Sequence, residues 1–249
     1  MTSFKELRPS ARVGVLVPTS NPTVEPELQY LVGDDVALYA ARFPYTPDLD
    51  LAQRIEGYPQ VFLDCAKAFG AIELNAYLAA MTGASYGLLK AGDDALCENL
   101  SAATGTVSTT ACRAIRLALG ALRAKRVALI SPYPAWLTDR AAKYWEDCGF
   151  DLTQVVMMSE EFRAYEMESD EVADTLAKID DEACDAVIMT GTGMLTIPAI
   201  LELRETINAT LLSSNLCAAW WIMDTVGSKG SDALAASCPA LQETFSRRS

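Results

Sequence analysis

Short hydrophobic runs alternate along the chain with longer segments of helical periodicity. Runs of strand length, bounded by turn residues, occur at 12–17, 36–42, 74–81, 106–108, 126–130, 152–158, 186–189 and 210–212. Segments with helical spacing of apolar residues lie between and after them, at 23–32, 51–71, 93–104, 109–122, 134–148, 169–179, 197–207 and 216–226. Strands that alternate with helices predict parallel sheets joined by right-handed crossovers.

The second half of the chain repeats signals of the first half in the same order. The segment 13–20 resembles 127–133, and 79–85 resembles 187–193. We therefore predict an α/β fold of two pseudo-symmetric lobes, each a four-stranded, mainly parallel sheet flanked by helices. The expected boundaries are 1–105 for the N-terminal lobe and 106–215 for the C-terminal lobe, with the C-terminal helix of 216–249 packing back on the first lobe. A strand followed by a turn of small residues is common in α/β proteins, so coincidence is the alternative.

The tripeptide Met-Thr-Gly ends a predicted strand in each half, at 81–83 and at 189–191. In an open α/β sheet, ligands bind just beyond the carboxyl ends of the strands. Glycine lets a ligand approach the backbone closely, and successive N–H groups in such a turn can hold an anion. We therefore expect the two turns to face each other and to form two walls of one site in the cleft between the lobes.

Composition narrows the chemistry of this site. The chain has no histidine, which excludes serine–histidine hydrolysis, imidazole acid–base catalysis and histidine-rich metal sites. The net charge of −13 argues against nucleic acid as a partner. Seven cysteines, an odd number with no CxxC pair, are expected to be reduced. No apolar run reaches the length of a membrane span, and the first 12 residues lack a secretory signal, so we expect a soluble, cytoplasmic protein with no membrane partner. No metal-ligand spacing is present, so we expect no metal.

Hydroxyl and amide side chains are dense in the predicted turns. They are Thr19, Ser20, Asn21, Thr82, Ser85, Tyr133, Thr190, Thr192 and Asn215. Donors of this kind beside glycines suit a carboxylate, or the enolate-like oxygens that form when a group next to it is removed. The alternative is that these residues are ordinary turn and capping residues.

Four of these motifs together resemble the aspartate/glutamate racemase superfamily, most closely its maleate cis-trans isomerase and arylmalonate decarboxylase branch. They are Pro18-Thr19-Ser20-Asn21, Ser131-Pro132-Tyr133, the segment 189–196, and Ser213-Ser214-Asn215. The resemblance runs from about residue 12 to residue 226. It implies two α/β lobes with a cofactor-free site between them, and relatives that are often dimers or larger, so we expect a homo-oligomer.

The usual chemistry of that superfamily uses two cysteines, one from each lobe, next to a substrate carboxylate. The resemblance places them in the turns that contain Gly83 and Gly191, so both catalytic thiols are expected to be replaced by glycine. It also implies that Asn21 anchors a carboxylate and that Ser85, Tyr133, Thr192 and Gly193 fit an oxyanion pocket. Ala84 replaces a hydroxyl residue that is common in the family.

The sequence therefore supports a cofactor-independent isomerase, lyase or decarboxylase that acts next to the carboxylate of a small acid. Tyr133 is the first candidate for acid or base, on the expectation that neighbouring donors lower its pKa, with Thr82, Ser85 and Thr190 assisting. The expected substrate-binding residues are Pro18, Thr19, Ser20, Asn21, Gly83, Ala84, Gly191, Thr192, Gly193 and Asn215. Lys90 and Arg163 are the cations that could reach the cleft. A non-catalytic protein that binds small carboxylates is the main alternative, and a nucleotide binder is disfavoured because G-x-G-x-x-G is absent.

Overall fold

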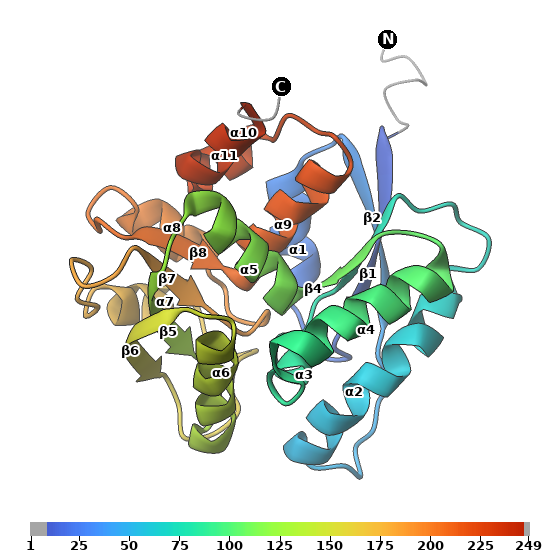
Figure 1. Cartoon of the computed structure of the whole chain (residues 1–249), viewed down its shortest axis with the longest axis horizontal. Helices are drawn as coiled ribbons and strands as arrows, with labels where there is room; N and C mark the ends of the chain where they lie inside the picture. Colours follow the sequence, from blue (N-terminus) through green and yellow to red (C-terminus); the bar gives the residue numbers. More distant parts are fainter. Residues whose placement is uncertain (1–8, 247–249) are drawn as a thin grey trace.

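Two parallel sheets of four strands each form the framework of the chain, which a computed structural model describes over residues 9–246 (Figure 1). The first sheet contains β1 (Ala11–Val17), β2 (Val36–Arg42), β3 (Ala76–Ala79) and β4 (Ser108–Thr110), in the order β2-β1-β3-β4. The second contains β5 (Arg126–Ser131), β6 (Asp151–Met157), β7 (Ala186–Met189) and β8 (Thr210–Ser213), in the order β6-β5-β7-β8. All strand pairs are parallel, so the predicted fold class is confirmed.

Helices cover both sheets and fill the space between them. They are α1 (Val24–Val32), α2 (Leu51–Ala66), the 3₁₀ helix η2 (Lys67–Phe69), α3 (Gly83–Tyr86), α4 (Leu89–Thr104), α5 (Ala111–Leu122), α6 (Ala135–Asp147), α7 (Ser169–Leu176), α8 (Ile197–Leu203), α9 (Ser214–Thr225), α10 (Asp232–Ser237) and α11 (Pro239–Ser246). Local signals explain several ends. Asp50 and Gln53 form a capping box at the start of α2, and the hydroxyl of Thr110 caps α5.

The boundary expected near Gly105 is wrong, because it divides the first sheet. Strand β4 pairs with β3, so the first sheet extends to Thr110. Helix α9 contacts both α1 and α5, and α10 also contacts α1, which places the C-terminal helices against the first lobe (Figure 1). The predicted C-terminal segment ends in residues 247–249, which lie outside the described part, as do residues 1–8.

The two sheets show which residues are equivalent in the two lobes. Leu16 lies beside Ala79 in the first sheet, and Ile130 lies beside Met189 in the second. One residue later, the N–H of Ala80 donates to Leu16 and the N–H of Thr190 donates to Ile130. This register makes Met81 the counterpart of Gly191, Thr82 that of Thr192, and Gly83 that of Gly193. Counted along the chain from the strands, Gly83 thus lies two residues farther from β3 than Gly191 does from β7.

The hydrophobic core continues from one lobe into the other. Its largest fully buried side chains include Phe43 and Phe62 in the first lobe and Tyr144 and Trp145 in the second. Within residues 9–246, no helix is both long and apolar enough to cross a membrane. The turns after β1 and β7 meet through Asn21 and Thr192, and those after β3 and β5 meet through Thr82 and Tyr133, at a buried junction between the lobes.

Candidate active site

Asn21 and Thr192 join the two lobes through their side chains. Asn21 accepts hydrogen bonds from the N–H groups of Thr23 and Val24, which orients its amide, and donates from Nδ2 to the hydroxyl of Thr192 at 3.1 Å. That hydroxyl donates in turn to the carbonyl of Ala80 at 3.0 Å. Asn21 and Thr192 therefore help define the junction between the lobes, and neither lines the small pocket described below.

A buried carboxylate from the first lobe, Glu27, holds the second lobe at a neighbouring point. Its oxygens accept hydrogen bonds from the N–H groups of Thr196 (2.6 Å) and Ile197 (2.9 Å), at the start of α8. Asn215 donates from Nδ2 to Glu27 at 2.7 Å and to the carbonyl of Thr192 at 3.1 Å. Asn215 therefore supports the turn after β7 from behind.

Thr82 and Tyr133 form the polar centre of the junction. Their hydroxyl oxygens lie 2.9 Å apart, and the N–H of Gly191 donates to the Thr82 hydroxyl at 3.2 Å. The predicted residues Thr82, Tyr133 and Gly191, from β3, β5 and β7 turns respectively, are thus in contact. The hydroxyl of Thr190 instead bonds to the carbonyl of Ile130 at 3.3 Å.

Burial sets the protonation state of Tyr133. Removal of its phenol from water raises its pKa well above the ordinary value, and the hydrogen bond from Thr82 only partly offsets this. The expectation that neighbouring donors lower this pKa is therefore wrong. Tyr133 is a neutral phenol at physiological pH, so it can donate a hydrogen bond or a proton but is a poor base.

A small pocket of about 50 Å³ opens beside this polar centre. It is lined by Thr19, Ser20, Pro44, Tyr45, Thr46, Leu51, Arg54, Tyr58, Met81, Phe162 and Tyr165. Of the predicted binding residues, only Thr19 and Ser20 line it. The space holds no more than a few water molecules. A small organic acid therefore fits only if side chains at its wall move.

Two aromatic side chains close the pocket over the polar centre. The ring of Phe162 stacks on that of Tyr133, with centroids 6.0 Å apart and an interplanar angle of 8°. Tyr165 lies against Gly193, where a Cβ atom would come within 2.4 Å of its ring. Gly193 is thus needed for the close approach of Tyr165, and Phe162 and Tyr165 are the side chains whose displacement would expose Tyr133.

Arg54 provides the positive charge of this pocket. It lies in the first turn of α2, forms no ion pair with any residue of 9–246, and leaves its buried Nε without a hydrogen-bond partner. Its charge lowers the pKa of both Tyr58 and Tyr165, against the larger effect of burial, and all three side chains line the pocket. Lys90 and Arg163 are instead paired with Asp94 and Glu171. Sequence analysis missed Arg54, although its place at the start of a helix after β2 was a usable signal.

A larger cavity of about 400 Å³ lies on the other side of α3. Its lining includes Ala84 and Tyr86 from α3 and Arg140 and Lys143 from α6. Arg140 is paired with the exposed carboxylate of Glu56 at 3.3 Å, and neither Thr82 nor Tyr133 lines this space. Thr82 and Tyr133 do not line the smaller pocket either, but Phe162, which stacks on Tyr133, lines it together with the unpaired Arg54. The smaller pocket is therefore the better candidate for chemistry.

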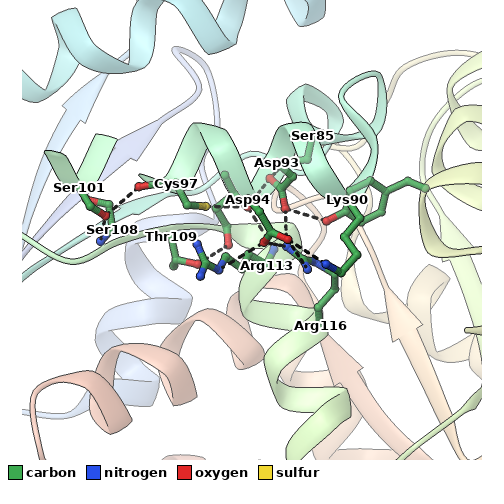
Figure 2. Close-up of polar contacts among 12 residues, drawn as sticks. Ser85, Lys90, Asp93, Asp94, Cys97, Ser101, Ser108, Thr109, Arg113 and Arg116 are labelled. Atoms are coloured by element: carbon green, nitrogen blue, oxygen red, sulfur yellow. Dashed lines mark hydrogen bonds and ion pairs between the residues drawn. The ribbon is translucent and has the colours of Figure 1, made fainter. Parts of the chain in front are cut away.

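Ser85 belongs to a network around a second buried carboxylate, Asp93 (Figure 2). Asp93 is fully buried and accepts hydrogen bonds from Ser85 and Thr110 at 2.7 Å on one oxygen. Tyr144 at 2.7 Å and Arg116 at 3.2 Å donate to the other oxygen. The Ser85 hydroxyl is thus committed to Asp93. Tyr144 comes from α6 of the second lobe, so this network also joins the lobes.

No thiol faces the pocket in the described part of the chain. Cys112 is the cysteine that contacts the polar centre, with its Sγ 3.5 Å from the carbonyl oxygen of Thr82. It is fully buried, and burial together with the charge of Asp93 raises its pKa well above the ordinary value. Cys112 is therefore a protonated, inaccessible thiol. The register places Met81 at the position equivalent to Gly191, and Met81 lines the pocket.

Known structures share this architecture. Maleate cis-trans isomerase of Nocardia farcinica, in a variant with a covalently bound succinylcysteine intermediate, superposes with a TM-score of 0.78 and 21% identity, over 94% of this chain and 98% of that chain. Maleate isomerase of Pseudomonas putida S16 gives 0.79 and 18%, over 94% and 99%. Arylmalonate decarboxylase gives 0.76 and 20%, over 93% and 99%. No curated protein sequence matches the chain.

The family is shown by the sequence of the chain itself. A sequence model of the arylmalonate decarboxylase family matches residues 13–238, which include both sheets except the first two residues of β1, and every residue of the polar centre. The two-lobed fold and its strand order agree with this match. The chain therefore belongs to the arylmalonate decarboxylase family.

Proposed function

We propose that this protein is a cofactor-independent enzyme that removes a group next to the carboxylate of a small acid, through an enolate-like state. The observation that carries the proposal is the contact of Thr82, Tyr133 and the Gly191 N–H beside a pocket that contains the unpaired cation Arg54. Arg54 attracts an anionic substrate into an acidic protein, and the neutral donors face the oxygens on which charge develops.

The geometry favours carbon–carbon lyase chemistry, in particular decarboxylation, over the other reactions known in the superfamily. In decarboxylation, the bond from the carbon atom to one carboxylate breaks, CO₂ leaves, and the electron pair moves into the remaining carboxylate to give an enediolate. That carbon then takes a proton from an acid; our candidate is Tyr133, a neutral phenol whose ring stacks on Phe162 of the pocket wall and whose phenolate would be reprotonated from solvent. Two-base racemisation needs a proton acceptor as well, and thiol addition needs an accessible cysteine.

Ligand binding and turnover test the proposal with Arg54→Met as the key variant. Malonate, phenylmalonate, maleate and succinate are added to the full chain, and the thermal midpoint and the ¹H NMR spectrum are recorded. We expect phenylmalonate or malonate to raise the midpoint and to yield a decarboxylated product. Arg54→Met should weaken binding about tenfold or more, which corresponds to the loss of one charge-assisted contact of about 1.4 kcal/mol or more.

Arg140→Met is the matched control, because Arg140 lies in the other cavity and is paired with Glu56. It should leave both binding and product formation unchanged. The proposal is contradicted if no acid of the panel alters the midpoint or the spectrum, or if Arg140→Met weakens binding as much as Arg54→Met does.

A non-catalytic carboxylate-binding protein is the second candidate, and a specific observation favours it. Neither Met81 nor Gly191, the equivalent positions of the two lobes, carries a nucleophile or a base, and Tyr133 is a weak acid. Binding of an acid by the wild-type protein, with no product and no deuterium incorporation in ²H₂O, would support this candidate over the enzyme.

A further inference from the structure

Helix α3 is too short to hold the polar centre in place by itself. It has four residues, Gly83–Tyr86, and begins with glycine. A single helical turn is unstable alone, because several dihedral angles are fixed for few hydrogen bonds, and glycine adds to that cost. Thr82 is the N-cap residue, but its side chain caps nothing, since its hydroxyl lies 2.9 Å from that of Tyr133 instead. The position of Thr82 therefore depends on contacts from outside α3.

Two donors hold the main-chain carbonyl of Thr82, and both are linked to Asp93. The N–H of Ser85 donates to this carbonyl at 3.0 Å, and the Sγ of Cys112 in α5 donates to the same oxygen at 3.5 Å. The Ser85 hydroxyl also donates to Oδ1 of Asp93 at 2.7 Å. Thr110, which caps α5 two residues before Cys112, donates to that Oδ1 atom at 2.7 Å. Asp93 thus anchors both supports of the Thr82 carbonyl.

The other oxygen of Asp93 reaches the phenol of the polar centre in the second lobe. Tyr144 on α6 donates to Oδ2 at 2.7 Å. The ring of Tyr144 packs on that of Tyr86, with centroids 5.8 Å apart, and the ring of Tyr86 packs on that of Tyr133, with centroids 6.1 Å apart. Arg116 donates to Oδ2 at 3.2 Å and compensates the charge of the buried carboxylate (Figure 2).

We propose that Asp93 is a positioning residue that holds the hydroxyl of Thr82 against that of Tyr133. It acts through Ser85 in the first lobe and through Tyr144 in the second. The inference rests on the proposed function, in which Tyr133 is the acid. Ser85 then contributes without touching the substrate, because its hydroxyl proton is donated to Asp93. Such positioning matters because a displacement of about 1 Å can lower the rate about 100-fold.

The amide of Gly191 reports on this geometry in the absence of substrate, because it donates to the Thr82 hydroxyl at 3.2 Å. Ser85→Ala removes one of the donors to Asp93 and keeps the main chain of α3. In the ¹H–¹⁵N spectrum of the full-length, unliganded protein, we expect Ser85→Ala to move the amide proton of Gly191 upfield, because its hydrogen bond lengthens as Thr82 shifts.

Kinetics in a double-mutant cycle separate positioning from a general loss of stability. Ser85→Ala should lower the kcat of phenylmalonate decarboxylation about tenfold and change KM by less than about twofold, because Ser85 does not touch the substrate. In the presence of Thr82→Val, which removes the hydroxyl to be positioned, Ser85→Ala should lower kcat by less than about twofold. Its effect on the thermal midpoint should be equal in both backgrounds, because Asp93 loses the same donor.

Ser101→Ala is the matched control for loss of a serine hydroxyl in the same region. Ser101 lies on α4, at the other end of the network that Figure 2 shows, where its hydroxyl donates to the carbonyl of Cys97 and accepts from the N–H of Ser108. Ser101→Ala should lower the thermal midpoint by an amount similar to that of Ser85→Ala. It should leave the Gly191 amide signal, kcat and KM unchanged.

The outcomes separate this inference from the proposed function. If Ser85→Ala moves the Gly191 amide signal no more than Ser101→Ala does, the positioning role of Asp93 is overturned, whatever the activity. An equal loss of kcat with and without Thr82→Val also overturns it, because Ser85 then acts independently of Thr82. If the Gly191 signal moves as expected but the wild type binds and converts no acid of the panel, the hold on Thr82 is supported and the proposed function fails.

Discussion

At the scale of single residues, the two glycines that look equivalent in the sequence serve different purposes. Gly191 adopts a left-handed backbone with φ of +88°, and a Cβ atom there would lie 2.4 Å from Pro132 Cγ. Gly83 begins α3, and a Cβ atom there would meet only the flexible end of Met81 at 3.1 Å and Ile55 at 3.4 Å. Backbone conformation and the ring of Pro132 require glycine at 191, whereas position 83 tolerates a side chain.

Gly191→Ala and Gly83→Ala form a matched pair that tests this difference. We expect Gly191→Ala to lower the free energy of unfolding by about 2–4 kcal/mol, from the strained backbone and the overlap with Pro132. Gly83→Ala should change it by less than about 1 kcal/mol, because Met81 can move and alanine favours the helix. Chemical denaturation monitored by circular dichroism measures both. Equal losses in the two variants would contradict this account of the junction.

The same residues show what the sequence could and could not predict about the site. The hydroxyl-rich turns could be predicted to meet, because carboxyl ends of parallel strands lie at one edge of a sheet, and Thr82, Tyr133 and Gly191 are in contact. Which residue of one turn corresponds to which residue of the other could not be predicted, because a repeated tripeptide carries no information about strand register. Asp93 was missed because its role depends on a contact with Tyr144, a residue far away in the chain.

At the scale of secondary structure, hydrophobic periodicity was sufficient to predict the bounds of an element that is buried along one continuous face. The strands Val36–Arg42 and Ala186–Met189 have the predicted bounds, and helix α1 begins one residue after the predicted start. The segment 51–71 ends earlier as an α-helix, at Ala66, and continues as a 3₁₀ turn to Phe69 before Gly70 with φ of +57°. Apolar spacing does not reveal such an end, since glycine acts there through its backbone.

Helix α8 is the element whose attachment to the other lobe depends on a single titratable group. Burial raises the pKa of the Glu27 carboxyl above its ordinary value of 4.5, and the bonds from Asn215, Ile197 and Thr196 oppose this less strongly. The folded protein therefore binds this proton at a higher pH than the unfolded chain does. Stability from this group is fully present below the unfolded pKa and is lost as pH rises through the folded pKa.

Glu27→Gln tests the sign of this linkage, because glutamine does not titrate. We expect the free energy of unfolding of the wild type, minus that of the variant, to fall as pH rises from about 4 to about 7. Urea denaturation at each pH measures it, with Glu202→Gln on the exposed side of α8 as the control for loss of one carboxylate. A difference that rises with pH would show that the hydrogen bonds from Asn215, Ile197 and Thr196 outweigh burial.

At the scale of the whole molecule, the lobes are joined by buried polar contacts as well as by the common core. Glu27 bonds from α1 to the start of α8, and Asp93 on α4 accepts a hydrogen bond from Tyr144 on α6. Asn21 and Thr192 join the turns between them. Buried groups that are bonded across the boundary would be left unsatisfied if one lobe unfolded alone. The lobes are therefore expected to unfold together.

Asp93→Asn tests this coupling. The amide has the size of the carboxylate, but its NH₂ group is a donor and cannot accept the hydrogen bonds that one carboxylate oxygen of Asp93 accepts. Four side chains donate to Asp93, so we expect the variant to lose about 2–4 kcal/mol of unfolding free energy. Differential scanning calorimetry should show one transition in both proteins, shifted as a whole in the variant. Tyr144→Phe, which removes only the contact across the boundary, should shift the same single transition by about 1–2 kcal/mol. Two resolved transitions, of which only one moves, would mean that the lobes are energetically separate and that the polar centre is not held by their union.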